Sequence, residues 1–355
     1  MKTYIRATAN ISPQQTFGNA AAAVPLLQEP VVQEGNRLRC AEPDYLRYID
    51  AKFIRRMSRI IKMGTAAAME CLQHAGVQNP DAIVMGTAYG CLEDTGIFLK
   101  KMVEQNEEML TPTAFIQSTH NTIGAQIALL LQCHNYNNTF VHRGFSFESA
   151  LLDAVLLLEE NAATTVLAGA ADEITDYSHG ILSRFGLYKK DPVTNISLFE
   201  RPSKGTFAGE GAAFFLLSNL ASEKNYAALD AFCTFYKPAD TKTVVAEIQQ
   251  FLKEQSLTAA DIDLVITGKN GDITGDAVYH NVLNTIFNGV SSGTYKQLCG
   301  EYPTSTAFAL WLAAALIKEK HCPPVVGAAP EKLERILVYN HYQNIHHSLM
   351  LVSQC

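Results

Sequence analysis

The apolar residues of this chain follow two spacings, one typical of helices and one typical of buried strands. Over residues 53–74 they recur every three or four positions, which predicts an amphipathic helix. Residues 81–90 and 164–173 are nearly continuous apolar runs that contain glycine, as expected for strands buried on both faces. Residues 4–11 alternate as a further strand. The chain is therefore predicted to mix helices with buried strands.

The same order of strands and helices is predicted twice. In the first part, strands alternate with helices at residues 91–107 and 119–133. After residue 225 the pattern restarts with strands at 227–236, 264–267, 293–298, 335–340 and 348–352, and helices at 241–253, 276–287 and 304–320. Alternating strands and helices predict an α/β fold whose mostly parallel sheet is covered on both faces. We therefore expect a duplicated unit, with halves at residues 1–222 and 223–355.

Composition and charge exclude several classes of protein. The 355 residues are 48% hydrophobic and 18% charged, as in an ordinary globular protein. A net charge of -7 argues against nucleic acid as the main partner, because binding phosphates requires a basic face. The longest apolar run, residues 307–317, is shorter than the roughly 20 residues that span a bilayer. We therefore expect no membrane span and no nucleic-acid partner.

The cysteine and histidine spacing does not indicate a metal or redox site. The eight cysteines are scattered without a CxxC pair, which is typical of buried thiols in a reducing compartment. His346 and His347 are adjacent on a predicted strand, where neighbouring side chains point to opposite faces. The N-terminus has no apolar signal core. We expect a cytoplasmic protein without a metal or cofactor.

One stretch has the layout of a nucleophile site without the nucleophile. A short β-rich run, residues 139–141, reaches a turn at Gly144, and an apolar-periodic helix follows at once. This layout presents one side chain at a helix N-terminus, where free N–H groups stabilise an anionic nucleophile. That position is Phe145, and a phenyl ring cannot act as a nucleophile.

Four groups of residues carry a resemblance to a known family. They are Gly86-Thr87 with Gly90, residues 112–138 including Asn121, residues 168–173, and Arg201-Pro202 followed by Phe207-Ala208-Gly209-Glu210-Gly211-Ala212. Over nearly its whole length the chain resembles the β-ketoacyl synthases, the condensing enzymes of fatty acid and polyketide synthesis. The resemblance implies the thiolase fold, in which two similar α/β halves form a five-layer αβαβα sandwich, and it implies a dimer.

The family's catalytic residues are a cysteine and two histidines, and all three positions are substituted here. The resemblance places the cysteine position at Phe145, the first histidine position at Gly268 and the second at Glu301. Residues 340–345 also depart from the family's glycine-rich loop. Supporting positions of the family are retained as Glu210, Lys296 and Asp276. The resemblance therefore implies a ketosynthase scaffold without condensing activity of its own.

Inactive ketosynthase homologues of this kind are familiar as chain-length factors, which pair with an active ketosynthase and bound its acyl tunnel. We expect that role in fatty acid, polyketide or aryl-polyene-type biosynthesis, with an acyl carrier protein as a further partner. By resemblance, helix 119–133 and the strand before Phe145 form the dimer interface. Candidates for the tunnel or interface are Phe115, Ile116, Asn121, Phe140, His142, Phe145 and Phe147. For Phe140 and Phe147 individually, core packing is the better interpretation.

The sequence also allows two alternative functions and contains one basic surface feature. Ser146 could be a shifted nucleophile with His142 or His120 as its base, which would give an acyltransferase or thioesterase. A homodimeric acyl-binding protein is the second alternative. The basic residues Arg55, Arg56 and Arg59 form either a solvated helix face or a docking patch for an acidic carrier protein.

Overall fold

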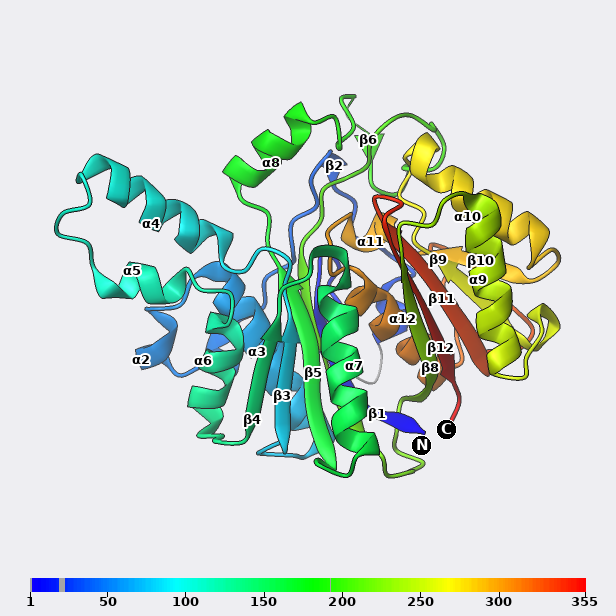
Figure 1. Cartoon of the computed structure of the whole chain (residues 1–355), viewed down its shortest axis with the longest axis horizontal. Coiled ribbons are helices and arrows are strands. Elements are labelled where there is room, and N and C mark those ends of the chain that lie inside the picture. The colour runs from blue at the N-terminus through cyan, green and yellow to red at the C-terminus, as the bar shows by residue number, and fades with distance from the viewer. Residues whose placement is uncertain (1, 19–22, 192) are drawn as a thin grey trace.

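The computed structural model describes residues 2–18, 23–191 and 193–355 (Figure 1). Ten strands join in one sheet in the order β10-β9-β11-β12-β8-β1-β7-β5-β3-β4. Their bounds are β1 Thr3–Ile11, β3 Ala82–Gly86, β4 Tyr136–Phe140, β5 Thr165–Asp172, β7 Gly211–Ser218, β8 Ala227–Tyr236, β9 Leu264–Thr267, β10 Ser291–Thr294, β11 Arg335–Tyr342 and β12 His346–Ser353. A two-stranded sheet pairs β2 (Glu34–Gly35) with β6 (Val193–Thr194).

The two halves of the large sheet have the same strand order. The order β4-β3-β5-β7-β1 is matched by β10-β9-β11-β12-β8, where each strand holds the same place in its half of the chain. In both halves β3 or β9 is parallel to its two neighbours, and the remaining two pairings are antiparallel. The halves meet where Thr3–Ile5 of β1 pairs with β8. The boundary that we propose near residue 222 falls in the connection between β7 and β8.

Helices and sheet halves alternate in five layers, with an apolar core at each junction. The central core joins both sheet halves to α7 (Ser146–Glu159) and α12 (Thr306–Glu319). A second core lies between the first half-sheet and the outer helices α3 (Arg59–Ala75) and α6 (Thr122–Leu131). A third lies between the other half-sheet and α9 (Thr241–Glu254) and α10 (Ile273–Thr285). Each helix thus buries an apolar face against a sheet, which is the arrangement that alternating elements favour.

Helix α12 explains the longest apolar run of the sequence. All residues of α12 from Thr306 to Ile317 are buried, because the helix lies in the central layer between two sheets. A helix that is apolar on every side is typical of such a position. In the described part of the chain, no helix is both long and apolar enough to cross a bilayer.

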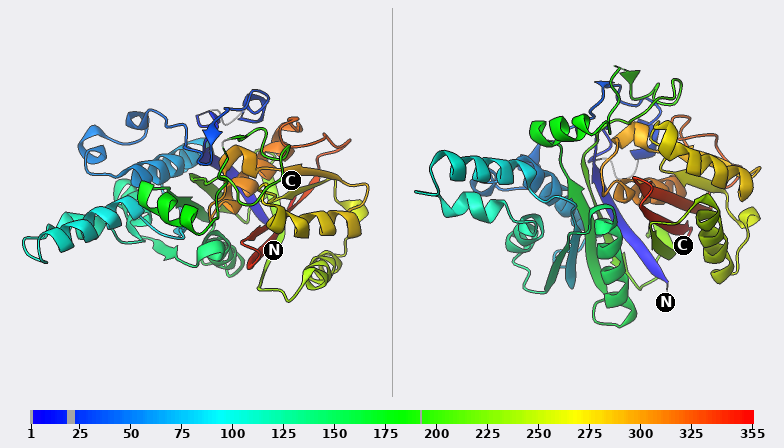
Figure 2. Two further views of the ribbon diagram at one scale, coloured as in Figure 1. Left: turned by 90° about the horizontal axis from the view of Figure 1, so that it is seen from above. Right: turned by 45° about the horizontal axis from the view of Figure 1, so that its top comes forward.

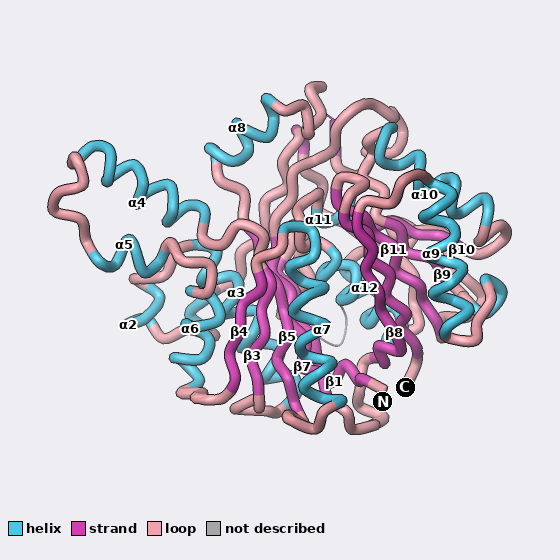
Figure 3. Tube along the Cα trace, in the orientation of Figure 1, coloured by secondary structure: helices cyan, strands magenta, loops and turns pink. Residues whose placement is uncertain are grey.

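Several predicted boundaries differ from the structure. The helix predicted over 53–74 is two helices, α2 (Ala51–Ile54) and α3, with Ser58 at the N-cap position of α3. Residues 91–107 contain the shorter α4 (Leu92–Glu104), and α8 (Asp176–Arg184) was not predicted because its buried positions are too few to give a periodic signal. The remaining short helices are α1 (Ala23–Leu26), α5 (Pro112–Gln117) and α11 (Lys296–Cys299), with single turns η1 (Tyr45–Arg47), η2 (Arg143–Phe145) and η3 (Ala259–Asp261). Figure 3 shows how much of the upper edge is loop.

The α4–α5 hairpin projects from the body of the protein. In Figure 1 it extends to the left, away from the sheets, and the view from above in Figure 2 shows the same projection. Phe98 of α4 and Phe115 of α5 hold the hairpin together, with ring centroids 5.6 Å apart. The hairpin therefore presents much of its surface outward.

Candidate functional site

Phe145 is the last residue of the turn in the predicted strand–turn–helix unit, directly before the helix. β4 ends at Phe140, η2 forms the turn, and α7 begins at Ser146. The phenyl ring is buried with an exposed fraction of 7%. Its ring centroid lies 4.8 Å from that of His346 and 5.7 Å from that of His142, and both contacts are edge-to-face. The nucleophile position is therefore filled by an aromatic cluster, which also includes Tyr236 at 6.4 Å.

Gly144 lets this turn approach the β11–β12 hairpin closely. A Cβ atom on Gly144 would lie 2.8 Å from Cβ of Tyr342 and 3.0 Å from Cβ of His346. These separations are shorter than non-bonded carbon atoms tolerate. The turn therefore packs closely against residues from the second half of the chain.

Ser146 is held by the backbone of its own turn. Its Oγ donates to the carbonyl of Arg143 at 2.9 Å and accepts from the amide of His142 at 2.8 Å. The side chain is fully buried. Within the described residues, no histidine ring is among its hydrogen-bond partners, so this geometry favours a structural role over that of a shifted nucleophile.

Gly268, at the first histidine position, has no space for a side chain. It follows β9, and a Cβ atom there would lie 2.1 Å from Oδ1 of Asn340 and 2.6 Å from Oη of Tyr279. The hydroxyl oxygen of Tyr279 accepts from the amide of His341 at 2.7 Å, and Tyr279 is fully buried. A histidine at this position would require the surrounding core to move.

Glu301, at the second histidine position, is held by two residues. Its Oε1 accepts from Nζ of Lys296 at 2.6 Å, and its Oε2 accepts from Nδ2 of Asn270 at 2.7 Å. Lys296 is fully buried and also donates to Oγ of Ser305 at 2.5 Å. A buried ammonium of this kind needs a paired anion. The carboxylate of Glu301 thus neutralises Lys296.

A cavity of about 430 Å³ lies beside Glu301. Its walls come from both halves of the chain: the loops after β5 and around 204–206, helix α8, and the β11–β12 hairpin. The residues that line the cavity include Tyr89, Glu173, Tyr188, Asn270, Glu301 and Tyr342. Such a volume lies in the range typical of sites for small organic ligands. Phe145 is not among the lining residues.

The carboxylates of Glu210 and Asp276 support the walls of the site. Glu210 is fully buried and accepts from the amides of Cys40 and Ile174 and from the guanidinium of Arg59. Asp276 accepts from the amides of Asn270 and Gly271, both at 2.9 Å. Burial raises the pKa of Asp276 to about 6, although these two amides act in the opposite direction. Both residues therefore fix the loops around the cavity.

The predicted docking patch needs one correction. Arg59 pairs with Glu210 through two hydrogen bonds of 2.7 and 2.8 Å, and its Nε also pairs with Glu42. The guanidinium is thus committed to an internal ion pair and is not a free surface charge. Arg55 and Arg56 remain exposed just before α3. The docking hypothesis is therefore restricted to these two residues.

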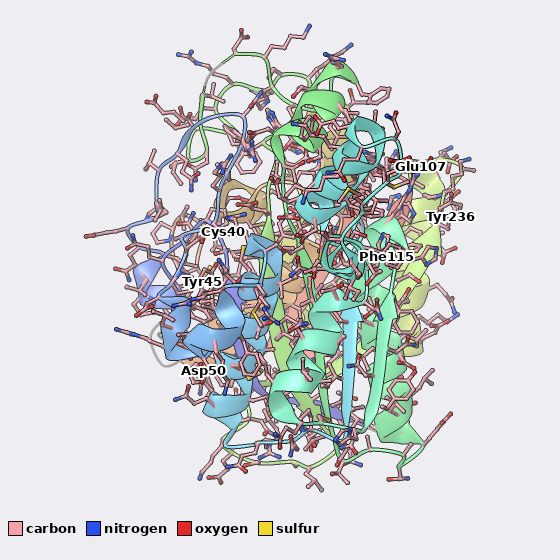
Figure 4. All side chains as sticks on the ribbon, turned by 90° about the vertical axis from the view of Figure 1, so that its left-hand side faces the viewer. Cys40, Tyr45, Asp50, Glu107, Phe115 and Tyr236 are labelled. Carbon is pink, nitrogen blue, oxygen red and sulfur yellow. The ribbon has the colours of Figure 1, made fainter. Side chains whose placement is uncertain are left out.

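The residues predicted for a tunnel or interface divide into three groups. Phe147 is fully buried in the central core, where its ring centroid lies 5.7 Å from that of Phe215. Phe140 is partly buried against the same core. Phe115 and Ile116 on α5 are more than half exposed, with fractions of 57% and 58%. Phe115 is labelled in Figure 4, in which the left-hand side of Figure 1 faces the viewer. The exposed polar residues are Asn121 and His142.

Sequence reasoning missed the parts of the cavity wall that lie outside the family motifs. Asn270, Glu173 and helix α8 all line the cavity. The polar run from Lys269 to Asp272 directly after a buried strand is a signal that could have found Asn270, because loops at the ends of parallel strands commonly form sites. The tyrosines of the wall gave no comparable signal, since each stands alone in the sequence.

Comparison with known families and structures identifies the fold. Residues 33–183 match the family model described as beta-ketoacyl synthase, N-terminal domain. The structure of the ishigamide ketosynthase/chain length factor matches with a TM-score of 0.82 and 14% identity, over 100% of this chain and 99% of that chain. Comparison with curated protein sequences found no match.

Two further solved structures are similar over the whole chain. A ketosynthase (ApeO) in complex with its chain length factor (ApeC) from Xenorhabdus doucetiae matches with a TM-score of 0.76 and 15% identity, over 100% of this chain and 98% of that chain. A type II PKS acyl-carrier protein in complex with its ketosynthase (AntDE:AntF) gives a TM-score of 0.75 and 15% identity, over 100% and 99%. The predicted resemblance and the thiolase-like five-layer fold are confirmed.

Proposed function

We propose that this chain, a divergent member of the β-ketoacyl synthase family, is a non-catalytic partner subunit of an active ketosynthase, acting as its chain-length factor. The observation that carries the proposal is the state of the three catalytic positions. Phe145 is packed in an aromatic cluster, Gly268 has no room for a side chain, and Glu301 is bound to Lys296. The scaffold is retained while the chemistry is lost.

Each substitution removes a specific step of condensation. A phenyl ring has no lone pair to attack a thioester. Stabilising the enolate that forms on decarboxylation requires hydrogen-bond donors, and Gly268 supplies none from its side chain. The carboxylate of Glu301 would place negative charge beside a developing anion. A partner must therefore carry out the reaction.

An exposed apolar face supports association with a second subunit. It surrounds β4, which lies at the edge of the sheet and pairs on one side only, with β3. An unpaired strand edge favours pairing with another chain. The exposed apolar side chains around it are Leu129, Tyr136, Val141, Leu152, Leu156 and Tyr236. Exposed apolar patches of this kind are typical of protein interfaces.

The occupant that we propose for this face is a ketosynthase of the same fold. The similar structures include a ketosynthase together with a chain length factor, and a ketosynthase together with an acyl-carrier protein. By this analogy the complex would also receive an acyl carrier protein, in a fatty acid, polyketide or aryl-polyene-type pathway in the cytoplasm. Phe115 and Ile116 on the projecting α5 would then contact the partner, and Phe145 would bound the acyl tunnel from this side.

The deciding experiment combines intact-protein mass spectrometry with reconstitution. The protein is incubated with acyl and malonyl carrier proteins, alone and together with the ketosynthase encoded beside its gene. We expect no covalent adduct on this chain, and condensation only when both proteins are present. A stable acyl adduct on this chain, on Ser146 or on a cysteine, would overturn the proposal in favour of a transferase.

A matched pair of variants tests the interface. Leu152→Asp places a charge on the apolar face of α7, whereas Tyr177→Asp places one on α8; both residues are exposed, at 48% and 71%. Leu152→Asp should abolish co-purification with the ketosynthase, and Tyr177→Asp should leave it unchanged. If the wild-type chain forms only homodimers, the homodimeric acyl-binding alternative is correct and the partner proposal is wrong.

A further inference from the structure

The cavity beside Glu301 carries more negative than positive charge. Four of its lining residues are acidic, namely Asp172, Glu173, Asp272 and Glu301, and among the described residues Lys204 is the one lining residue that carries a permanent positive charge. Lys204 is exposed at the rim, while Asp172 and Glu173 are buried. In their ionised forms these inner carboxyl groups repel an anionic ligand and attract a cation.

Two cations near the cavity are paired within the protein. Lys296 lies behind Glu301 and is bound to it and to Ser305. The guanidinium of Arg37 donates to Oδ1 of Asp176 and to the carbonyl of Ile174, both at 2.6 Å. Each of these positive groups is already paired, so neither is free to hold an anion in the cavity.

Glu173 presents an unpartnered oxygen to the cavity. Its Oε1 accepts from the amide of Glu93 at 3.0 Å, and in the described part of the chain its Oε2 has no hydrogen-bond partner. The side chain lines the cavity and is only 7% exposed. This oxygen is therefore free to accept a hydrogen bond from a donor that a ligand brings into the cavity.

The two other deep carboxylates are satisfied by the protein. Asp172 accepts from Oγ1 of Thr87, the amide of Ala88 and Oγ1 of Thr304 at 2.7 to 3.0 Å. Glu301 is held by Lys296 and Asn270. Glu173 is therefore the acidic group that remains available for a ligand at the inner wall.

Burial allows a bound cation to change the protonation state of Glu173. It raises the pKa of this carboxyl to about 7, with further contributions from the negative charges of Asp94 and Glu210, while Arg59 acts in the opposite direction. A positively charged group placed against Oε2 would favour the ionised form and gain a charge-assisted hydrogen bond.

Aromatic rings complete a surface that suits a cation. Tyr89, Tyr188 and Tyr342 line the cavity, and the hydroxyls of Tyr89 and Tyr342 lie 3.5 Å apart. Tyr188 is fixed by stacking on His179, with ring centroids 5.1 Å apart and planes at 7°. Tyrosine faces attract ammonium groups, and the attraction is larger in a site shielded from water.

We propose that this cavity is a binding site for a small organic amine, with the ammonium group on Oε2 of Glu173 and the body of the ligand against the tyrosines. The volume of about 430 Å³ admits an aromatic amine of moderate size. This inference goes beyond the proposed partner role, since a chain-length factor can act whether or not the cavity is occupied. The same charges disfavour the carboxylate of a malonyl group.

The test uses three ligands that share a hydroxyphenyl ring and differ in the end group and its charge. Tyramine, tyrosol and 4-hydroxyphenylacetate share one ring and chain length and end in an ammonium, a hydroxyl and a carboxylate group. Binding to the full chain is measured by isothermal titration calorimetry and by saturation-transfer NMR. We expect tyramine to bind at least about tenfold more tightly than 4-hydroxyphenylacetate, with tyrosol between them. Equal affinity for all three, a preference for the carboxylate, or no binding of tyramine would overturn the proposal.

Two variants assign the effect to Glu173. Glu173→Gln keeps the shape and removes the charge, and it should weaken tyramine binding about tenfold without changing the binding of tyrosol. Lys204→Gln removes the rim cation and should leave tyramine binding unchanged or strengthen it. Thermal unfolding of both variants verifies that they fold. Tyramine affinity that is unchanged in Glu173→Gln would refute the site, whatever the outcome of the ketosynthase reconstitution.

Discussion

The ammonium of Lys296 lies 2.6 Å from Oε1 of Glu301, so the carboxylate of Glu301 neutralises this buried lysine. Lys296 has no exposed surface, and the side chain of Glu301 has an exposed fraction of 10%. The ion pair therefore lies between the core and the cavity. It gives Glu301 a structural role at the wall of the cavity.

Removing one partner of this pair should destabilise the protein strongly. Lys296→Met leaves a buried carboxylate without its cation, which typically costs about 3–5 kcal/mol of the free energy of unfolding. The double variant Lys296→Met/Glu301→Gln removes both charges and should recover a large part of that loss. Denaturant-induced unfolding at pH 7 measures both. Equal losses in the single and double variants would show that the charge pair is not the cause.

Gly268 should not accept even a methyl group. In Gly268→Ala the new Cβ would meet Oδ1 of Asn340 at 2.1 Å and Oη of Tyr279 at 2.6 Å, and such overpacking typically costs about 1–3 kcal/mol. Gly180→Ala on α8 is the control, because nothing lies within 4 Å of its Cβ position. Thermal unfolding should show a lower Tm for Gly268→Ala and an unchanged or higher Tm for the control. A Tm unchanged in Gly268→Ala contradicts the expectation.

Glu148 should make the stability of the protein depend on pH. It is fully buried on α7 in the central layer, and burial raises the pKa of its carboxyl from 4.5 to about 7, outweighing the hydroxyls of Thr306 and Ser348. The folded state therefore binds this proton more tightly than the unfolded state. The resulting stability is present below pH 4.5 and is lost as pH rises towards 7, by about 3 kcal/mol in total.

Glu148→Gln removes this titration and tests its sign. The variant should be more stable than the wild type at pH 8, whereas the difference should shrink or reverse at pH 5. Urea unfolding at both pH values gives the comparison. Glu160→Gln, at the exposed end of the same helix, should show no such change. A difference between Glu148→Gln and wild type that is the same at both pH values would argue against the raised pKa.

Arg55 and Arg56 are the residues of the basic patch that remain free to bind a partner. Reversing both charges in Arg55→Glu/Arg56→Glu should weaken the binding of an acidic carrier protein, most strongly at low salt. Arg59 is left intact, because its replacement would break the pair with Glu210. Lys242→Glu/Lys253→Glu on α9, which changes the net charge by the same amount, serves as a control for net charge. If the wild type, the arginine variant and the control bind the carrier protein with the same affinity, this surface is solvated and does not bind the carrier protein.

Local sequence signals were sufficient for most of the elements. Alternation and helical spacing predicted β1 and the core of α3, because each pattern reports which side of a single element is buried. The restart after residue 225 predicted a duplicated unit, and the two halves of the sheet do share one strand order. The prediction of a mostly parallel sheet was wrong, because the strands where the halves meet pair antiparallel. The loss of the nucleophile at Phe145 is likewise a matter of residue identity, since no folding can turn a phenyl ring into a thiolate.

The tertiary structure decided which groups meet. Arg59 pairs with Glu210, 151 positions away, and Gly268 is closed off by Asn340 and Tyr279 from other elements. Neither contact leaves a periodic mark in the sequence, because both arise where separate layers pack against each other. The same holds for the cavity, whose acidic and aromatic walls come from loops in both halves of the chain. The sequence by itself determined most of the elements and the side chain at position 145, while packing between separate elements determined the ion pairs, the lack of space at Gly268 and the cavity, because burial and charge depend on neighbours that only folding brings together.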